Sequence, residues 1–309
     1  MFDRYHEFES LFASIQVVLV MLGMGMTISP AEFMAIARQP RSLFVGCLCQ
    51  FLLAPVLTWI TISLIPLDAG ISVGLLLISA MPGGPLANLY TFLARGNVAL
   101  SVSLTGIATI GSLLSVPLLL ETLARGHVPP EIPMPVEKVL VDVLLFLLAP
   151  LACGMVFLRL APRWATSVSP WLIRAGLVIL VLMVTGSLGS GRIEPLSYGW
   201  TTPVVIIVLC VAIQNLSMAL FPIFRWPVAD QTAVGIGVTI RNVNLALLLA
   251  ARLFPSSTES ASGKAIGGGV LYVALFWGAL SLVVCLSSIF FQRRALEAES
   301  ARLHATQTP

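Results

Sequence analysis

Apolar segments of about twenty residues recur along the whole chain, and they restrict the possible folds more than any other feature. A helix of about 20 apolar residues crosses the hydrocarbon core of a bilayer. Inside that core the backbone must satisfy its own hydrogen bonds, so only helices and closed barrels span it. Of the 309 residues 58% are hydrophobic and 10% are charged, whereas soluble domains carry about 25% charged residues. The sequence predicts an all-α polytopic membrane protein, a single membrane domain over residues 1–309.

Nine segments are predicted to be transmembrane helices. A link of two to five residues is typical of antiparallel neighbouring helices, and some of the links here are that short. The residues after the last span form a polar tail, 292–309. The approximate bounds of the spans are 10–28, 42–65, 69–93, 98–123, 138–160, 170–188, 200–224, 229–253 and 265–291.

The basic residues of the loops favour one orientation. Cytoplasmic loops carry an excess of arginine and lysine, and an odd number of spans places the termini on opposite sides. With the N-terminus outside, ten basic loop residues are cytoplasmic and six are external. We therefore expect a protein of the inner (plasma) membrane with its N-terminus out and its C-terminus in. The ten are Arg38, Arg41, Arg95, Arg159, Arg163, Arg174, Arg225, Arg293, Arg294 and Arg302, and the six are Arg4, Arg125, Lys138, Arg192, Arg252 and Lys264.

Two of the predicted spans are interrupted by residues that break helices. The third contains Pro82-Gly83-Gly84-Pro85, and the eighth contains glycines followed by Arg241 and two asparagines. Proline and glycine are unfavourable inside a helix, and backbone groups freed within a membrane must be satisfied by protein or water. Each break is either a kink packed against neighbouring helices or part of a cavity. Broken helices in corresponding positions of two halves indicate a transport site.

The position of the breaks also predicts an internal repeat. They lie five spans apart, and a repeat with an odd number of spans inverts its orientation in the membrane. This fits two inverted halves of five spans each, with one span missing from the first half. The first repeat covers about 1–124 and the second about 136–291, and the cytoplasmic tail follows.

Arg241 is a charge inside an apolar segment. Placing a charge at that depth costs roughly 2.5–3.5 kcal/mol, and such residues usually face a cavity on a substrate or ion pathway. A guanidinium pairs well with a carboxylate or sulfonate, and helix N-termini favour anions. We predict a small organic anion bound between the two breaks, at Pro85, Asn88 and Arg241.

At these residues the chain resembles the bile acid:sodium symporter family, which includes bacterial homologues of the intestinal bile acid transporter. The resemblance implies panel and core domains, two crossed discontinuous helices, and inward transport of organic anions with sodium. It also implies that Asn242 faces substrate and that Asn244, in place of a small residue, alters substrate choice. The matching segments are Gly23 to Thr27 with Pro30 and Phe33, Gln50-Phe51 with Pro55, Pro82 to Asn88, Thr91 to Val102 with Thr105, and, more loosely, Gly235 to Asn242.

The family's two sodium sites are only partly kept. The retained polar positions are Gln50, Asn88, Ser101, Thr105 and Thr239. The resemblance implies a serine where Ala87 stands, a shared glutamate where Gly237 stands and a glutamine where Arg241 stands. The last two replacements together add the charge of two sodium ions. We hypothesise that Arg241 replaces bound cations, bonds to Gln50 and the backbone of its own span, and removes the need for sodium. The alternative is a remnant sodium site at Asn88, Ser101 and Thr105.

Other function classes are less compatible with the composition. A membrane-embedded enzyme needs a catalytic pair or a metal site, but Asp142 is the only aspartate away from the very end of a predicted span, since Asp230 is the second residue of the eighth. No histidine lies in a predicted span. We expect Asp142 to be paired or hydrated near the outer interface. No catalytic residues, metal site or cofactor are predicted, and sodium is doubted as a coupling ion. The net charge of +3 reflects loop arginines, so the expected partners are an organic anion and the bilayer but no nucleic acid. We expect a monomer. A membrane sensor or channel that binds ligand without transporting it remains open.

Overall fold

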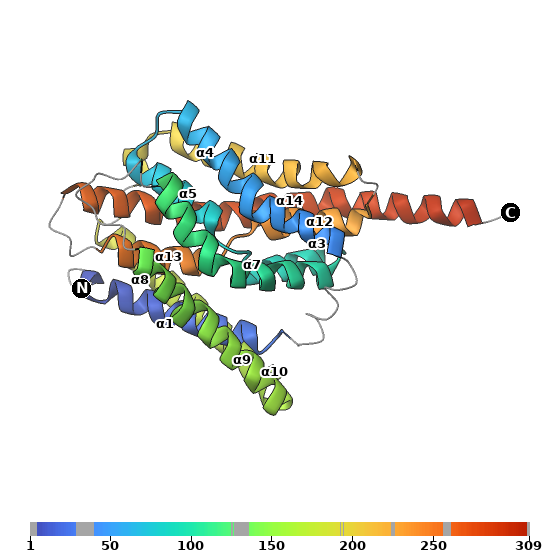
Figure 1. Ribbon diagram of the computed structural model, residues 1–309, viewed down its shortest axis with the longest axis horizontal. Helices are drawn as coiled ribbons and strands as arrows, with labels where there is room; N and C mark the ends of the chain where they lie inside the picture. The colour runs from blue at the N-terminus through green and yellow to red at the C-terminus, as the bar shows by residue number, and fades with distance from the viewer. Residues whose placement is uncertain are drawn as a thin grey trace.

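The computed structural model describes residues 5–28, 40–124, 126, 136–191, 193, 195–223, 226–255 and 261–307, and its regular structure over these residues is helical (Figure 1). Seven helical segments among them are long and apolar enough to cross a membrane. The chain is therefore a polytopic helical membrane protein. The elements are α1 (Tyr5–Gly25), α3 (Pro40–Leu48), η2 (Cys49–Leu53), α4 (Ala54–Leu64), α5 (Ala69–Ala80), α6 (Pro85–Leu93), α7 (Val98–Leu119), η3 (Leu120–Ala124), α8 (Val136–Asp142), η5 (Val143–Leu148), α9 (Ala149–Leu160), α10 (Pro162–Gly189), η6 (Pro195–Tyr198), α11 (Thr201–Ile223), α12 (Val228–Thr239), α13 (Val243–Leu253) and α14 (Ala261–Gln307).

The two segments predicted to be interrupted are pairs of short helices. Segment 69–93 forms α5 and α6, and segment 229–253 forms α12 and α13. Two other elements are longer than predicted. Helix α10 begins at Pro162 instead of near 170, because proline is well suited to the first turn of a helix. Helix α14 continues through the tail as far as Gln307. The alanine, leucine, glutamate and arginine residues of the tail favour helix formation. Pro30 and Phe33 lie outside the described residues.

Two of the spanning helices contain a π-helical turn just before a proline. Turn η2 precedes Pro55, and turn η5 precedes Pro150. A proline ring clashes with the carbonyl four residues earlier, and the wider π turn moves that carbonyl away. Such turns are frequent at functional sites, and η2 contains the buried Gln50.

Helices α1, α9 and α10 pack closely together, and small residues make this possible. A Cβ atom on Gly25 would overlap the carbonyl of Leu151 in α9. On the other side of α1, the Ser169 hydroxyl in α10 donates to the carbonyl of Gly23 at 2.8 Å. Small residues let membrane helices approach closely, and hydroxyls can bond across the interface. We call α1, α8, η5, α9 and α10 the α1 group.

We call the other helices the α14 group. Helix α5 packs along α14, where a Cβ on Gly70 would lie 2.8 Å from the Ile266 carbonyl oxygen. Helices α7 and α11 pack against α12, and α13 lies between α1 and α14. In Figure 1 the C-terminal part of α14 projects beyond the other helices, and the two chain ends lie at opposite ends of the long axis.

The turn between α6 and α7 explains the most specific sequence motif of the chain. Arg95 has a positive φ of 57°, and the Gly96 N–H donates back to the Thr91 carbonyl, which closes α6 with a Schellman-type bond. The side chain of Asn97 caps α7 through the N–H of Leu100. It also donates to Asp230 at the start of α12, at 2.8 Å. The motif thus ties α6, α7 and α12 together.

Candidate functional site

The two breaks cross and are hydrogen-bonded to each other. Gly84 N–H donates to the carbonyl of Ile240, and Asn242 N–H donates to the carbonyl of Pro82, both at 2.8 Å. The backbones of Gly83 and Arg241 thereby form a short antiparallel bridge. Four half-helices, α5, α6, α12 and α13, therefore meet at one point.

Glycine is required at this crossing because the two backbones approach so closely. A Cβ on Gly84 would lie 2.6 Å from the backbone oxygen of Arg241. A Cβ on Gly83 would lie 3.1 Å from the oxygen of Gly237 and 3.2 Å from the Thr105 hydroxyl. The Pro-Gly-Gly-Pro sequence therefore both ends a helix and allows the backbone of the other break to approach closely.

Other carbonyls freed by the breaks also have donors. The Trp277 indole of α14 donates to Thr239 O at 3.1 Å, and the carbonyl of Arg241 accepts from Val243 N–H at 2.9 Å. The carbonyl of Met81 accepts two bonds, from Arg241 Nη1 at 3.0 Å and from Gln50 Nε2 at 2.7 Å. These carbonyls are thus satisfied by protein groups, as a membrane interior requires.

Arg241 is buried, with 2% of its surface exposed. Its guanidinium bonds to the backbone of the other break at Met81 and not, as hypothesised, to the backbone of its own span. Gln50 lies beside it and shares that carbonyl, but no direct Arg241–Gln50 bond is seen. Within the described structure Nε and Nη2 of Arg241 and Oε1 of Gln50 are buried without a hydrogen-bond partner.

A second cluster contains the other polar residues predicted from sequence. Ser101 Oγ donates to Asn88 Oδ1 at 2.8 Å, and Thr105 Oγ1 lies 3.5 Å from the same oxygen. Thr91, which sequence reasoning missed, donates to Ser101 Oγ at 3.1 Å. Thr239 does not join these contacts, because its hydroxyl donates to the Gly235 carbonyl of its own helix at 2.7 Å.

A cavity of about 440 Å³ opens beside the crossing. The N-terminal residues of α6 and α13 line it, including the predicted site residues Pro85, Arg241 and Asn244. The predicted residues Asn88 and Asn242 are not in its wall. The side chains of α1, α10 and α14 that complete the wall are mostly aliphatic; they are Val20, Ile173, Leu177, Leu180, Val181, Val184, Thr185, Leu275, Ala279, Ser281 and Leu282.

The two asparagines of the second break both contact α1, but through different kinds of contact. Asn242 caps α13 through Leu245 N–H at 3.1 Å, and its amide nitrogen lies 3.8 Å from the Met21 sulfur. Asn244 Oδ1 accepts a hydrogen bond from Gln16 Nε2 at 2.5 Å. Gln16 was missed from sequence, although an amide inside an apolar span is a recognisable signal of a polar contact.

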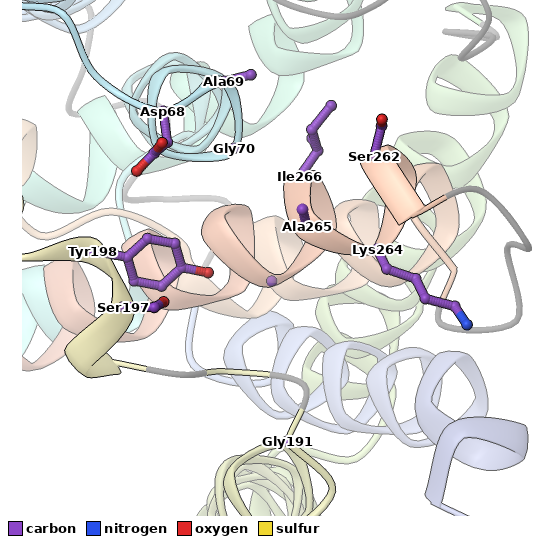
Figure 2. A pocket seen from close by; sticks show the side chains of 11 residues that line it. Asp68, Ala69, Gly70, Gly191, Ser197, Tyr198, Ser262, Lys264, Ala265 and Ile266 are labelled. Atoms are coloured by element: carbon purple, nitrogen blue, oxygen red, sulfur yellow. The ribbon is translucent and has the colours of Figure 1, made fainter.

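A second cavity of about 590 Å³ lies where the N-terminal ends of α5 and α14 approach η6 (Figure 2). Asp68 and Tyr198 face one part of it, whereas the Lys264 side chain extends away from them in Figure 2. Asp68 and Lys264 are exposed, and none of the predicted site residues lines this cavity. The cavity at the crossing is therefore the candidate substrate site.

Comparison with known proteins relates the chain to membrane transporters. The family model described as "Sodium Bile acid symporter family" matches residues 14–193. The chain is 27% identical over 264 residues to "Probable sodium/metabolite cotransporter BASS2, chloroplastic" of Oryza sativa subsp. japonica, covering 84% of this chain and 62% of that protein. It is 28% identical over 249 residues to "Uncharacterized sodium-dependent transporter YocS" of Bacillus subtilis (strain 168), covering 79% and 75%.

A mammalian relative extends the comparison. "Sodium/bile acid cotransporter 4" of Mus musculus is 28% identical over 252 residues, covering 80% of this chain and 57% of that protein. The chain thus spans less than two thirds of the rice and mouse relatives. All three relatives are named as transporters, and none is named as an enzyme. Because the family model covers more than half of the chain, this protein belongs to the sodium bile acid symporter family.

Proposed function

We propose that the protein transports small organic anions by alternating access and does not require sodium. The observation that carries this proposal is the cavity at the N-termini of two half-helices, α6 and α13. A helix N-terminus carries partial positive charge and unbonded N–H groups. Two such ends at one aliphatic cavity suit a carboxylate or sulfonate on a small apolar body.

Backbone donors support the preference for anions. Leu86 and Asn244 are the second residues of their half-helices, and both line the cavity. Within the described part of the chain no acceptor takes their backbone N–H groups. Arg241, buried between the two helix ends, adds a positive charge nearby.

The contacts of Met81 support the proposed independence from sodium. A sodium ion needs several oxygen ligands, usually with anionic help. The carbonyl of Met81 already accepts from Arg241 and Gln50, so two nitrogen donors occupy its lone pairs. Gly237 offers no carboxylate. The guanidinium thus supplies the positive charge that supports the crossing.

The arrangement of the helices supports the rest of the proposal. If both broken pairs cross the bilayer, the chain has nine spans in two inverted repeats, residues 1–124 and 136–291. The α1 group then acts as the panel and the α14 group as the core, and they move relative to each other around the cavity. We propose a monomer in the inner membrane with its N-terminus out and its C-terminus in.

The Asn88 cluster favours a second candidate, a sodium-coupled symporter with one remnant site. Oxygens of Asn88, Ser101 and Thr105 lie together, and all three relatives named above are called sodium transporters or cotransporters. Those names describe those proteins. Here Ser101 donates to Asn88 Oδ1, Thr91 donates to Ser101 Oγ, and Thr105 donates to the Ser101 carbonyl. These bonds occupy lone pairs of the accepting oxygens and leave fewer for an ion.

Transport assays separate the two candidates. Purified protein is first screened by thermal shift against branched four- to eight-carbon carboxylates and sulfonates, with sodium chloride or choline chloride. Uptake of the strongest stabiliser is then measured in proteoliposomes at fixed membrane potential. We expect equal initial rates in the two salts. A rise of about tenfold on adding sodium, saturable in sodium, would establish the symporter instead; a tenfold change corresponds to about 1.4 kcal/mol.

A further inference from the structure

The cavity has few polar side chains, and the hydroxyls among them are already used. Thr185 donates to carbonyls of its own helix, and Ser281 does the same. The guanidinium of Arg241 donates to Met81 O through Nη1, and its Nε and Nη2 are buried away from the cavity surface without a partner in the described structure. Within the described structure no partner is recorded for the amide nitrogen of Asn244, the remaining polar side chain of the wall.

Gln16 contacts that amide from behind, and the Oε1 atom of Gln16 is buried without a partner in the described structure. Gln16 is fully buried in α1, one turn before the cavity residue Val20. Its Nε2 donates to Asn244 Oδ1 at 2.5 Å. An asparagine amide has an acceptor and a donor end, so holding the oxygen toward Gln16 leaves the NH₂ group for the cavity. Gln16 itself is not part of the cavity wall.

We infer that Gln16 is a positioning residue that fixes Asn244 as a hydrogen-bond donor and so makes the cavity select anions over cations. This inference rests on the proposed function, since it assigns the charge selectivity of the same site. If the amide turned over, its oxygen would face the substrate head group and would favour an ammonium group instead. The direction of one hydrogen bond behind the wall then adds to the anion preference that the helix ends and Arg241 supply.

Two substitutions at Gln16 change that direction in different ways. A glutamate is only an acceptor when ionised, so in Gln16→Glu the amide of Asn244 must turn its NH₂ toward α1 and its oxygen toward the cavity. Gln16→Met has similar length but no polar atom, so the amide loses its orientation without any added charge. Each is also made with Asn244→Ala, because in that background only direct effects of the Gln16 substitution remain.

The probes are 3-methylbutane-1-sulfonate and 3-methylbutylammonium, which share an apolar body and have opposite charge. Their Kd values are measured by calorimetry on purified protein, and size-exclusion profiles establish that each variant is folded. A merely structural defect weakens both probes alike, whereas reorientation of the amide changes their ratio. We expect the wild-type protein to favour the sulfonate by about tenfold or more, as for a hydrogen bond to a charged group.

We expect Gln16→Met to reduce that preference by about fivefold and Gln16→Glu to reverse it, with much smaller changes in the Asn244→Ala background. The inference would be overturned if the ratio of the two Kd values stayed within about twofold of the wild type in both variants, or shifted equally with and without Asn244. Neither result would affect the proposed function. Wild-type protein that prefers the ammonium probe, or binds neither, would overturn the proposed function as well. That failure is visible before any substitution is made.

Discussion

At the scale of single residues, Arg241 and Gln50 determine how the crossing is held. Both donate to the carbonyl of Met81, and both keep buried polar atoms without a partner in the described structure. Burying a charge with so few bonds is unfavourable. Its retention is explained if the guanidinium replaces cations that other members of the family bind.

Introducing at two positions the residues that the family resemblance implies should therefore create a sodium response. The double variant Gly237→Glu/Arg241→Gln adds a carboxylate at position 237, where there is no side chain, and exchanges the guanidinium at position 241 for an amide. A Cβ at Gly237 meets only the end of the Leu104 side chain, at 3.3 Å, so a side chain can be accommodated. We expect sodium at 100 times its Kd to stabilise the double variant by about 2.7 kcal/mol, as measured by thermal shift against choline.

The wild-type protein is the control for this double variant and should show no sodium-specific shift. The two single variants report which residue matters more. An equal sodium shift in the wild type and the double variant would mean that Arg241 does not replace a cation.

At the scale of elements, the half-helices depend on one another because each break satisfies the other's backbone. Two hydrogen bonds join residues 82–84 to 240–242, and close contact at Gly84 makes them possible. Neither broken segment would be satisfied by itself in a membrane, so the two are expected to form together.

Gly84→Ala tests this dependence. The added Cβ would lie 2.6 Å from Arg241 O, and overpacking of this kind costs about 1–3 kcal/mol. We expect a lower thermal midpoint and loss of anion binding. Gly126→Ala is the matched control, because a Cβ there meets nothing within 4 Å. Equal midpoints for the two variants would contradict the close approach.

Elements of the two groups are also joined by an ion pair. Arg252 at the end of α13 lies 3.2 Å from Asp142 of α8, donates to Ser14 of α1 at 3.1 Å, and stacks 4.4 Å from the ring centroid of Phe146. Asp142, which was expected to be paired or hydrated, is therefore paired. Since the pair joins the α1 and α14 groups, it holds them in the arrangement seen here.

Asp142→Asn and Arg252→Gln should each lower the thermal midpoint. The pair is only partly buried, with side-chain exposures of 9% and 36%, so we expect about 1–2 kcal/mol for each, between surface and buried pairs. A double-mutant cycle should show coupling between them. Arg159→Gln, which alters an exposed arginine of α9, should have little effect. Additive losses in the cycle would show that the ion pair contributes nothing.

At the scale of the whole molecule, the sequence predicted the helical spans and the two breaks because hydropathy and Pro-Gly clusters are local properties. It also grouped Asn88, Ser101 and Thr105 correctly through the family resemblance. It did not reveal that Arg241 bonds to Met81 or that Gln16 bonds to Asn244. Contacts between segments so far apart in the chain depend on the packing of whole helices. The ends of α10 and α14 were missed because hydropathy does not detect polar helical turns.

Membrane orientation is a prediction for the molecule as a whole. In a background without the five native cysteines, Gly126→Cys and Ala305→Cys are labelled in intact cells with a membrane-impermeant maleimide. The positive-inside distribution leads us to expect labelling of position 126 before lysis and of position 305 only after it. Labelling of both positions from the same side would rule out an odd number of spans between them.

The length of α14 makes it a natural reporter of motion. Its 47 residues extend about 70 Å at 1.5 Å per residue, more than twice the hydrocarbon thickness of about 30 Å. The hydrogen bond of Trp277 joins the helix to the crossing. The last residue of α14 lies about 45 Å further along the helix. A tilt of about 5° at the crossing would displace that end by about 4 Å. A spin label or fluorophore on the tail would therefore record rearrangements at the substrate site from the aqueous phase, without disturbing the cavity itself.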